Sequence, residues 1–359
     1  MAEVDFTALR ASLLQRLKEG ESCRFVLGPC PQELLAEKEL MLKALEFNAY
    51  VVEYLPDELL SDRDLWLKAT QQNFYILRQC PQQLLNDKAF AMQLLAMDAS
   101  ALCFLGSELR GDREVVSFAL SRNGLALEFA SRDLRADREI VLQAVHKDGL
   151  ALEFADPELL MEESLALEAM KANTAVVRLL PDALSRSMSF LLQAARAGGG
   201  SILRFVAPEF ANDKVFVEHV IKFDCTTLAH APPQLQEDPE LVLAAIAAGG
   251  PQGSAALELA PASLREDRNF LLRAAKITPQ ALRLAPESLK ADRSFVLESV
   301  QRRGAALQFA AFEFRADPAV VLEAVKQDLG ALAFADAPIR QNDKFREEIR
   351  CLQKVVALN

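Results

Sequence analysis

The heptapeptide GLALEFA stands at residues 124–130 and again, unchanged, at 149–155. Steps of about 25 residues along the chain find weaker copies of the same unit. With Ala130 taken as position 1 of the unit, position 5 is large and apolar in thirteen successive copies: Leu34, Leu59, Leu84, Leu109, Leu134, Leu159, Leu184, Phe210, Leu235, Leu264, Leu289, Phe314 and Ile339. Tandem copies of so short a unit predict a repeat architecture, in which each copy packs against its neighbours.

Each copy carries the pattern of one α-helix. Position 8 is typical of an N-cap because it is Asp in nine copies and Pro follows it in two: Asp62, Asp87, Asp112, Asp137, Asp213, Asp238, Asp267, Asp292 and Asp317. Positions 11, 12, 15 and 16 are apolar, which is helical spacing. Position 15 is Ala in nine copies, and a small side chain there lets adjacent helices approach closely: Ala44, Ala69, Ala119, Ala144, Ala169, Ala194, Ala245, Ala274 and Ala324.

The second half of each copy predicts a helix end and a short second helix. Position 20 is Gly at 124, 149, 199, 250 and 304, and this predicts a left-handed residue at the helix C-terminus. The segment LALEFA then predicts a short helix that carries Leu152 and Phe154 inward. Pro at position 2, in seven copies, predicts that this helix stops in a tight turn.

A 25-residue unit is too small to hold its own core, so the units must share apolar faces. The sequence therefore predicts an all-α fold, an α-solenoid: a superhelical stack of about thirteen 25-residue helical repeats over residues 30–342, interrupted at 198–200 and 249–254. Residues 1–29 are expected to form an N-terminal capping helix and lead-in, and residues 343–359 a C-terminal capping helix. The two expected capping helices carry apolar faces: Phe6, Leu9, Leu13 and Leu17, and Phe345, Ile349, Leu352 and Val356.

The composition restricts the classes of partner and the cellular compartment that we expect. The net charge of −11 disfavours nucleic acid as a partner, because binding must neutralise phosphates. The longest apolar run, Leu241–Ala248, is too short to cross a membrane, and no secretory signal is visible. The six cysteines have no C-x-x-C spacing and fit a reduced compartment. We expect a cytoplasmic monomer that has no membrane contact.

The sequence predicts no catalytic residue, no cofactor and no metal site. His146 and His219 lie at positions that are polar in most copies, whereas His230 replaces the usual aromatic residue of position 25 and is expected to be partly buried. None of the three pairs at metal-ligand spacing. Phosphate-loop, dinucleotide-binding and zinc-protease motifs are absent.

Other chemistry-bearing residue types are interpreted as structural. Cys30, Cys80 and Cys103 are expected to be small core residues, and Trp66 fills an apolar helix position. The nine Asp of position 8 resemble a carboxylate array but are accounted for as N-caps.

Positions 6 and 9 carry the candidate binding residues. Position 6 is basic at Arg110, Arg135, Arg265, Lys290 and Arg315, and position 9 at Arg113, Arg138, Arg268 and Arg293. Equivalent positions align in a stack, so two basic ridges are expected, near 110–138 and 265–315. One interpretation is local ion pairing with the capping Asp or with a Glu such as Glu114 or Glu139. The other is binding of an acidic or phosphorylated partner through bidentate Arg contacts.

The segment LRADREIVLQAVHKDGLALEFA, residues 134–155, resembles the repeat of the domain-of-unknown-function family numbered 4116. The shared pattern is Leu-basic-x-Asp-basic, then Val-Leu-x-Ala-Val, then Gly-x-Ala-Leu-x-Phe-Ala, and two units make one family domain. The resemblance is strong over 105–155 and 285–335, moderate over 206–284, and weak over 30–104 and 156–205. The unit 180–205 departs most, with Ser187 in place of Asp. The family implies helical repeats and supplies no catalytic residues.

Three functions remain open on the sequence alone. The first is a non-enzymatic scaffold that binds a protein or peptide, including an acidic or phosphorylated one. The second is a helical-repeat RNA-binding protein, which would need a basic face with stacking side chains. The third is an enzyme with a site between repeats.

Overall fold

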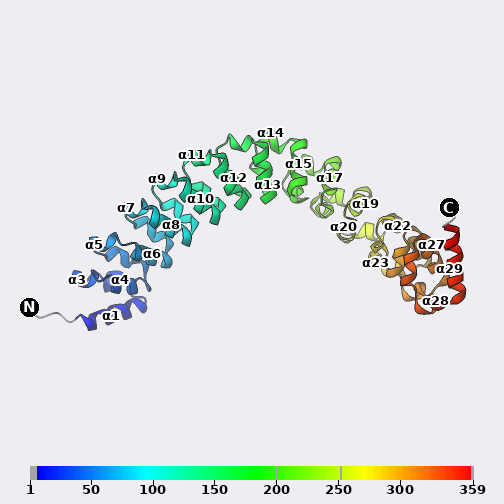
Figure 1. The fold of residues 1–359 in the computed structure, drawn as a ribbon, viewed down its shortest axis with the longest axis horizontal. Helices are drawn as coiled ribbons and strands as arrows, with labels where there is room; N and C mark the ends of the chain where they lie inside the picture. Colours follow the sequence, from blue (N-terminus) through cyan, green and yellow to red (C-terminus); the bar gives the residue numbers. More distant parts are fainter. Residues whose placement is uncertain (1–5, 199, 251–252, 357–359) are drawn as a thin grey trace, which may run out of the picture. The chain divides into compact units, whose positions relative to one another are not determined.

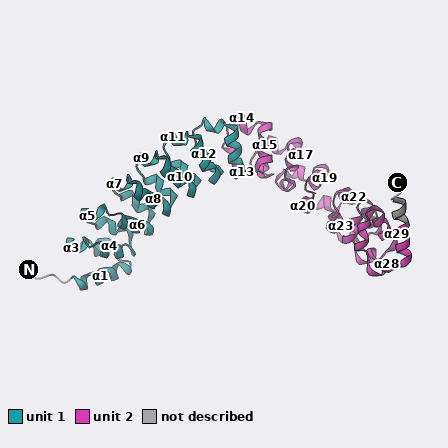
Figure 2. Ribbon diagram, viewed as in Figure 1, with its two compact units in different colours: residues 1–173 teal, residues 174–359 magenta. Residues whose placement is uncertain are grey.

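The computed structural model describes the backbone of residues 6–198, 200–250 and 253–356, and the side chains of these residues except those of Gly200 and 351–356. The described residues are helical with short connections, and no strand occurs among them (Figure 1). The chain forms two compact units, residues 1–173 and 174–359 (Figure 2), and each is described by itself. Both units are tandem arrays of one helical repeat.

A repeat consists of three helices. In the repeat that begins at Ala130, these are the one-turn helix α11 (Arg132–Arg135), the long helix α12 (Arg138–Lys147) and the 3₁₀ helix η5 (Gly149–Phe154). Where position 2 is Pro, that Pro is the N-cap of the one-turn helix, as in Pro56 and Pro286. The predicted helix stop and turn are confirmed, and the turn is a single turn of α-helix: the fixed φ of Pro ends the 3₁₀ helix and begins this turn.

In the first unit the long helices follow one another in chain order (Figure 1). They are α4 (Lys38–Ala44), α6 (Arg63–Gln72), α8 (Lys88–Met97), α10 (Arg113–Arg122), α12 and α13 (Glu163–Ala172). The one-turn helices are α3 (Gln32–Leu35), α5 (Asp57–Leu60), α7 (Gln82–Leu85), α9 (Ser107–Arg110) and α11, with η6 (Leu159–Met161) in the corresponding place before α13. The 3₁₀ helices are η1 (Ala49–Tyr54), η2 (Phe74–Gln79), η3 (Ala99–Phe104), η4 (Gly124–Phe129) and η5.

The second unit repeats the arrangement with more variation. Its long helices are α15 (Met188–Gly198), α17 (Lys214–Ile221), α19 (Pro239–Ala248), α22 (Arg268–Ile277), α25 (Arg293–Arg302) and α27 (Pro318–Gln327). Its short α-helices are α14 (Asp182–Ser185), α16 (Pro208–Ala211), α18 (Pro233–Gln236), α21 (Ala262–Glu266), α24 (Glu287–Lys290), α26 (Phe312–Arg315) and α28 (Ala337–Gln341). The 3₁₀ position is filled by η7 (Thr174–Arg178), η8 (Gly200–Arg204), η9 (Cys225–His230), α20 (Gly253–Leu259), α23 (Gln280–Leu284), η11 (Gly304–Phe309) and η12 (Leu329–Phe334).

The predicted N-caps are confirmed at every one of the nine Asp of position 8. Each has an extended backbone, and its carboxylate accepts one or two N–H groups from the first turn of the long helix. Asp137 Oδ1, for example, lies 2.9 Å from the nitrogen of Glu139 and 3.2 Å from that of Ile140. Ser187 also accepts, at 3.4 Å from the nitrogen of Phe190, so its helix keeps a weaker cap.

A second cap, at position 19, escaped the sequence interpretation. Asn or Asp there ends the long helix in an extended conformation and accepts the N–H of position 21, which starts the 3₁₀ helix. Asn123 Oδ1 lies 3.0 Å from the nitrogen of Leu125, and Asp148 Oδ1 lies 2.9 Å from that of Leu150. Because the same cap recurs from one repeat to the next, positions 18–21 have the same local geometry in each.

The core lies between the long helices and the 3₁₀ helices. All nine Ala of position 15 are completely buried, as predicted. Within each unit, successive long helices contact one another, as α10 contacts α12 and α25 contacts α27. Trp66 is 1% exposed, which confirms its core assignment, and its indole N–H donates to the carbonyl of Leu60. Leu152 is buried as predicted, whereas Phe154 is only half-buried.

The left-handed conformation predicted for glycine at position 20 is wrong in three repeats. Gly124, Gly149 and Gly304 have negative φ, and the extended residue before each of them ends the helix. A Cβ on Gly124 would lie 2.4 Å from the carbonyl oxygen of Ala144 in the next repeat, and one on Gly149 would lie 2.3 Å from that of Ala169. Glycine is therefore required by close approach between repeats. Gly250 does have positive φ, +49°, and Gly199 lies outside the described residues.

Helices also cover the first and last repeats of the array. The first is α1 (Thr7–Lys18), which packs on α4 and α2 (Cys23–Val26), with Leu13 and Leu17 buried and Leu9 exposed. The last is α29 (Asp343–Val356), which packs on α27 and α28 and buries Phe345 and Ile349. The side chains of Leu352 and Val356 lie outside the described residues, as do parts of the interruptions at 198–200 and 249–254.

Candidate functional site

The structure divides the nine candidate basic residues into two groups. The four at position 9 are paired: Arg113 with Asp137 and Glu139, Arg138 with Glu162, Arg268 with Asp292 and Glu298, and Arg293 with Asp317. In every pair the carboxylate belongs to the following repeat, and most often it is the N-cap of the next long helix. Arg293 and Asp317 approach to 2.7 Å. These pairs are the local ion pairs of the first interpretation, but each of them joins two neighbouring repeats and none lies within one repeat.

We call these ion pairs, between position 9 of one repeat and a carboxylate of the next, the inter-repeat ladder. It includes more residues than the sequence indicated. Four more basic residues at position 9 bind the capping Asp of the next repeat: Lys38 to Asp62, Arg63 to Asp87, Lys88 to Asp112, and Lys214 to Asp238. The hydrogen bond from Lys88 holds the pKa of the Asp112 carboxyl below its ordinary value, and the N–H groups of Val115 and Glu114 add to the effect. The position-9 cations thus stabilise caps, because they bind the carboxylate oxygen that the helix N–H groups leave free.

The position-6 residues are placed differently. Lys290 pairs with Glu287 at 2.9 Å, within its own one-turn helix. Arg110, Arg135, Arg265 and Arg315 are half-buried, and in each the Nε atom is buried without a hydrogen-bond acceptor. No carboxylate in the described part of the chain forms an ion pair with any of these four. An Nε–H that is removed from water without an acceptor costs about 1–3 kcal/mol. Each of these guanidinium groups therefore has at least one N–H donor that no acceptor in the described chain uses.

The backbone holds these arginines next to the following repeat. The carbonyl oxygen of Arg135 accepts the N–H of Asp156 at 2.9 Å, and the carbonyl oxygens of Arg110 and Arg315 accept the N–H of Ser131 and Asp336 in the same way. Arg110, Arg135 and Arg315 therefore each sit at a fixed point where two repeats meet.

Small hollows recur at this junction. One of about 170 Å³ is lined by Arg132 and Arg135 on one repeat and by Asp156 and Pro157 on the next. A second, of about 210 Å³, is lined by Arg265 and Pro286 in the equivalent places. The third, of about 260 Å³, has Ser185 at position 6. The junction is thus a repeated shallow site, and basic side chains line all three hollows: Arg132 and Arg135, Arg265, and Arg178 and Arg186.

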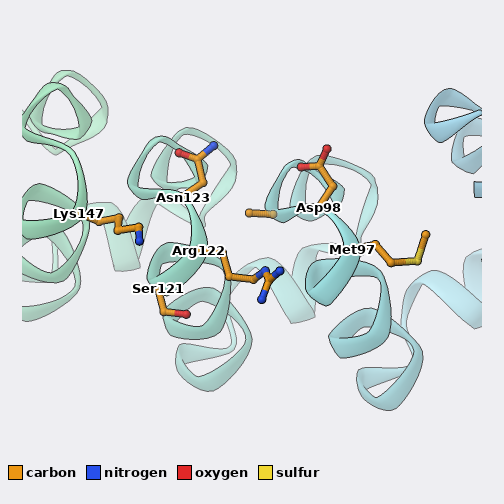
Figure 3. Close-up of a pocket in the computed structure, with 7 residues that line it drawn as sticks. Met97, Asp98, Ser121, Arg122, Asn123 and Lys147 are labelled. Carbon is orange, nitrogen blue, oxygen red and sulfur yellow. The ribbon is translucent and has the colours of Figure 1, made fainter. Parts of the chain in front are cut away.

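Another hollow, of about 440 Å³, lies at the opposite end of the long helices in the first unit (Figure 3). It crosses three repeats at positions 17–20 and is lined by Met97, Asp98, Arg122, Asn123 and Lys147. Figure 3 shows Lys147 extending toward the repeat of Arg122, and Arg122 toward the repeat of Met97. The sequence interpretation did not single out these residues. The available signal was basic residues in the last turn of α10 and α12, where the helix dipole also favours cations.

The remaining titratable residues are not gathered into a site. His146 and His219 are exposed, as predicted, but His230 is also exposed, so its predicted burial is wrong: position 25 faces outward at that repeat. Burial raises the pKa of Cys80 to about 12, and it also raises the pKa of the Cys23, Cys30, Cys103 and Cys225 thiols. Thiols so shifted are poor nucleophiles at neutral pH. Over the described ranges, no group of three or more His, Cys, Asp or Glu is placed to hold a metal ion.

A family model with the description "Domain of unknown function (DUF4116)" matches the chain five times in tandem, at residues 37–85, 87–135, 137–185, 238–290 and 292–340. Each match spans two successive repeats and together they cover more than half of the chain. The match at 37–85 extends the family into a stretch of weak resemblance, and residues 186–237, between the third and fourth matches, include most of the divergent repeat 180–205. Searches of curated proteins and of solved structures find no match. Within the described segments, no helix combines the length and hydropathy that crossing a membrane requires.

Proposed function

Because the chain belongs to the family described as Domain of unknown function (DUF4116), a description that gives no activity, we propose its function from the geometry of the repeats. It is a non-enzymatic scaffold that binds a protein or peptide with acidic side chains. The cytoplasmic location expected from its unpaired cysteines is part of the same proposal, and the five described cysteines are free.

The observation that supports this function is the row of position-6 arginines. The position-9 cations already have carboxylate partners in the next repeat. Arg110, Arg135, Arg265 and Arg315 have none, and each has a buried Nε–H without an acceptor. A carboxylate or phosphate from a partner would supply acceptors to the guanidinium fork, and such charge-assisted bonds are about twice as strong as neutral ones.

The spacing of the arginines defines the partner. Arg110 and Arg135 occupy the same position in successive repeats of the first unit, and packed helices lie about 9 Å apart. An extended chain advances about 3.3 Å per residue. Acidic residues three apart in an extended segment therefore reach both arginines, and the hollow beside Arg135 leaves room for one carboxylate or phosphate.

The test is binding of a fluorescein-labelled peptide with Glu at every third position, measured by fluorescence anisotropy. Replacing Arg110 and Arg135 together by Gln should weaken binding about tenfold or more without lowering the melting temperature, because each replacement removes a buried Nε–H that has no acceptor. The matched control replaces Arg113 and Arg138 by Gln; it should lower the melting temperature, because it removes two rungs of the ladder, and preserve affinity. Equal affinity of the wild type and the R110Q/R135Q variant would refute the proposal. A second peptide with phosphoserine at the same places tells whether phosphate is preferred to carboxylate.

We also propose that the repeats form an α-solenoid of about thirteen units with a capping helix at each end. The support is that long helices contact those of the neighbouring repeats and that the ladder joins successive repeats. Such arrays present long surfaces of aligned equivalent positions. Small-angle X-ray scattering should report an elongated or curved monomeric particle, and the maximum dimension of a compact sphere would contradict this arrangement.

A further inference from the structure

We infer that the first unit carries a second binding surface, which takes an extended peptide whose apolar half is followed by an acidic half. This inference rests on the proposed role in binding, but it uses a different face of the repeats. The surface consists of an apolar stripe, formed by Phe47, Tyr50, Tyr75, Met97 and Leu125, and of a cationic end, formed by Arg122 and Lys147.

The apolar stripe is exposed although its residues are large. Tyr75 is 65% exposed, Tyr50 47% and Phe47 40%, and Met97 and Leu125 are 38% and 36% exposed. All five lie at position 18 or 21 of successive repeats, on either side of the Asn or Asp cap of position 19. Because that cap fixes the same geometry in every repeat, the five side chains lie along one face. Exposed apolar patches of this kind mark interaction sites.

The repeat itself does not require apolar residues at these places. Position 21 is Thr226, Ala305 and Gly330 in repeats of the second unit, each of which still forms its 3₁₀ helix. Position 18 is Ala172 at the end of α13. Aromatic residues at positions 18 and 21 are therefore confined to a few repeats, and core packing does not account for them.

The number of cationic side chains changes along the same face. From the repeat of Phe47 to that of Met97, positions 17–21 hold only two charged residues, Glu46 and Asp98, and Glu46 is paired with Lys68 at 3.1 Å. The next two repeats place Arg122 and Lys147 at position 18, beside the hollow of about 440 Å³. Among the described residues neither cation forms an ion pair, whereas the neighbouring His146 and Lys171 both face Glu168.

The two halves specify the occupant by complementarity. An uncharged aromatic stretch favours apolar side chains, and two cations without carboxylate partners favour acidic ones. Four repeat steps separate Phe47 from Lys147, which is about 36 Å at about 9 Å per step, or about eleven residues of extended chain. Single-stranded RNA also stacks on aromatic side chains, but it would need cations along its whole length. Both cations lie at one end, and the carboxylate of Asp98 lines the same hollow as they do.

The experiment uses the full chain and a labelled peptide of about eleven residues, with three Phe or Leu in one half and three Asp or Glu in the other. We expect saturable binding in fluorescence anisotropy. Tyr50→Ser with Tyr75→Ser, and separately Arg122→Glu with Lys147→Glu, should each weaken binding about tenfold or more. All four side chains are exposed, so the melting temperature should not change. Lys276→Glu, which reverses a last-turn lysine of α22 in the second unit, is the control for charge reversal at a helix end outside this surface and should bind normally.

The outcomes separate this inference from the proposed function. Binding of the Glu-repeat peptide without binding of the mixed peptide overturns the second surface and leaves the position-6 row intact. Mixed-peptide binding that the Tyr50/Tyr75 variant does not weaken also overturns it. Tighter binding of single-stranded RNA that requires the same tyrosines would replace the peptide by RNA. Self-association in sedimentation, abolished by the same variant, would identify the occupant as a second copy of the chain.

Discussion

Ser299 is the polar residue among otherwise apolar residues at position 15 of the long helices, and it allows a sharp stability test. It lies at position 15 of α25 and is completely buried, and its hydroxyl has no hydrogen-bond partner. The flanking repeats have Ala274 and Ala324 in the same place, also completely buried. Ser299→Ala should therefore stabilise the second unit.

The magnitude follows from two favourable terms and one opposing term. An unsatisfied buried hydroxyl costs about 1–3 kcal/mol, and Ala exceeds Ser in helix propensity by about 0.5 kcal/mol. Removing the oxygen leaves a small void that offsets a few tenths of a kcal/mol, at about 24 cal/mol per Å³. The net expectation is a gain of about 1–2 kcal/mol.

The assay is hydrogen exchange of the α25 amides as a function of urea, because a repeat array need not unfold in one step. The reciprocal variant, Ala324→Ser in α27, should lose a similar amount and serves as the control. A Ser299→Ala protein that is no more stable than the wild type, beside a neutral Ala324→Ser, would refute the reasoning; it would mean that this junction satisfies a buried hydroxyl.

Three further predictions concern the junctions between repeats. Gly124→Ala should destabilise the protein by about 1–3 kcal/mol, because its Cβ would lie 2.4 Å from the backbone oxygen of Ala144. The control Gly111→Ala, whose Cβ would have no atom closer than 3.4 Å, should change stability by less than about 0.5 kcal/mol. Equal shifts of the melting temperature in the two variants would contradict this prediction. Asp112→Ala should cost about 1 kcal/mol in urea denaturation, and Asp112→Asn, which keeps the cap, should recover most of it; an Asn variant as unstable as Ala would assign the loss to the Lys88 pair. The pKa of Asp112 is lowered in the folded state, so its stabilisation is fully present above the ordinary value of 3.8 and is lost as the pH falls through the folded value; a urea midpoint that does not fall on acidification below that value would show that the caps do not stabilise the fold.

The parts of the fold that sequence predicts well are those whose cause lies within one repeat. Asp137 caps the helix that begins with the next residue, and Ala144 faces a neighbour wherever α12 packs. Both signals recur many times at fixed spacing, so accidental resemblance is excluded. The helix content, the cap positions and the family follow from them.

The parts that failed depend on how one repeat is set against the next. Arg110 and Arg113 look equivalent in the sequence, yet Arg113 begins a long helix beside the next cap, and Arg110 ends a one-turn helix where its Nε–H has no acceptor. Gly124 satisfies two rules that both demand glycine, a left-handed helix end and a close backbone approach, and only the inter-repeat distance to Ala144 decides between them. Only the structure therefore separates the nine candidate basic residues: the four at position 9 belong to the inter-repeat ladder, and Lys290 pairs with Glu287.

The ladder has a direction, because each cation at position 9 reaches 24 residues forward to the cap of the following helix, as Lys88 reaches Asp112. Each such repeat thus supplies a cation to the N-cap of the following repeat, and the ladder supplies none in the reverse direction. Shortening the array from its carboxyl end leaves every remaining cap with its cation, whereas shortening it from the amino end strips the cation from whichever helix becomes first. During synthesis on the ribosome, likewise, each long helix whose cap belongs to the ladder meets a cation that is already in place, as α10 meets Lys88. Lengthening by duplication needs no new interface, since one copied segment brings both the acceptor for the repeat before it and the donor for the repeat after it.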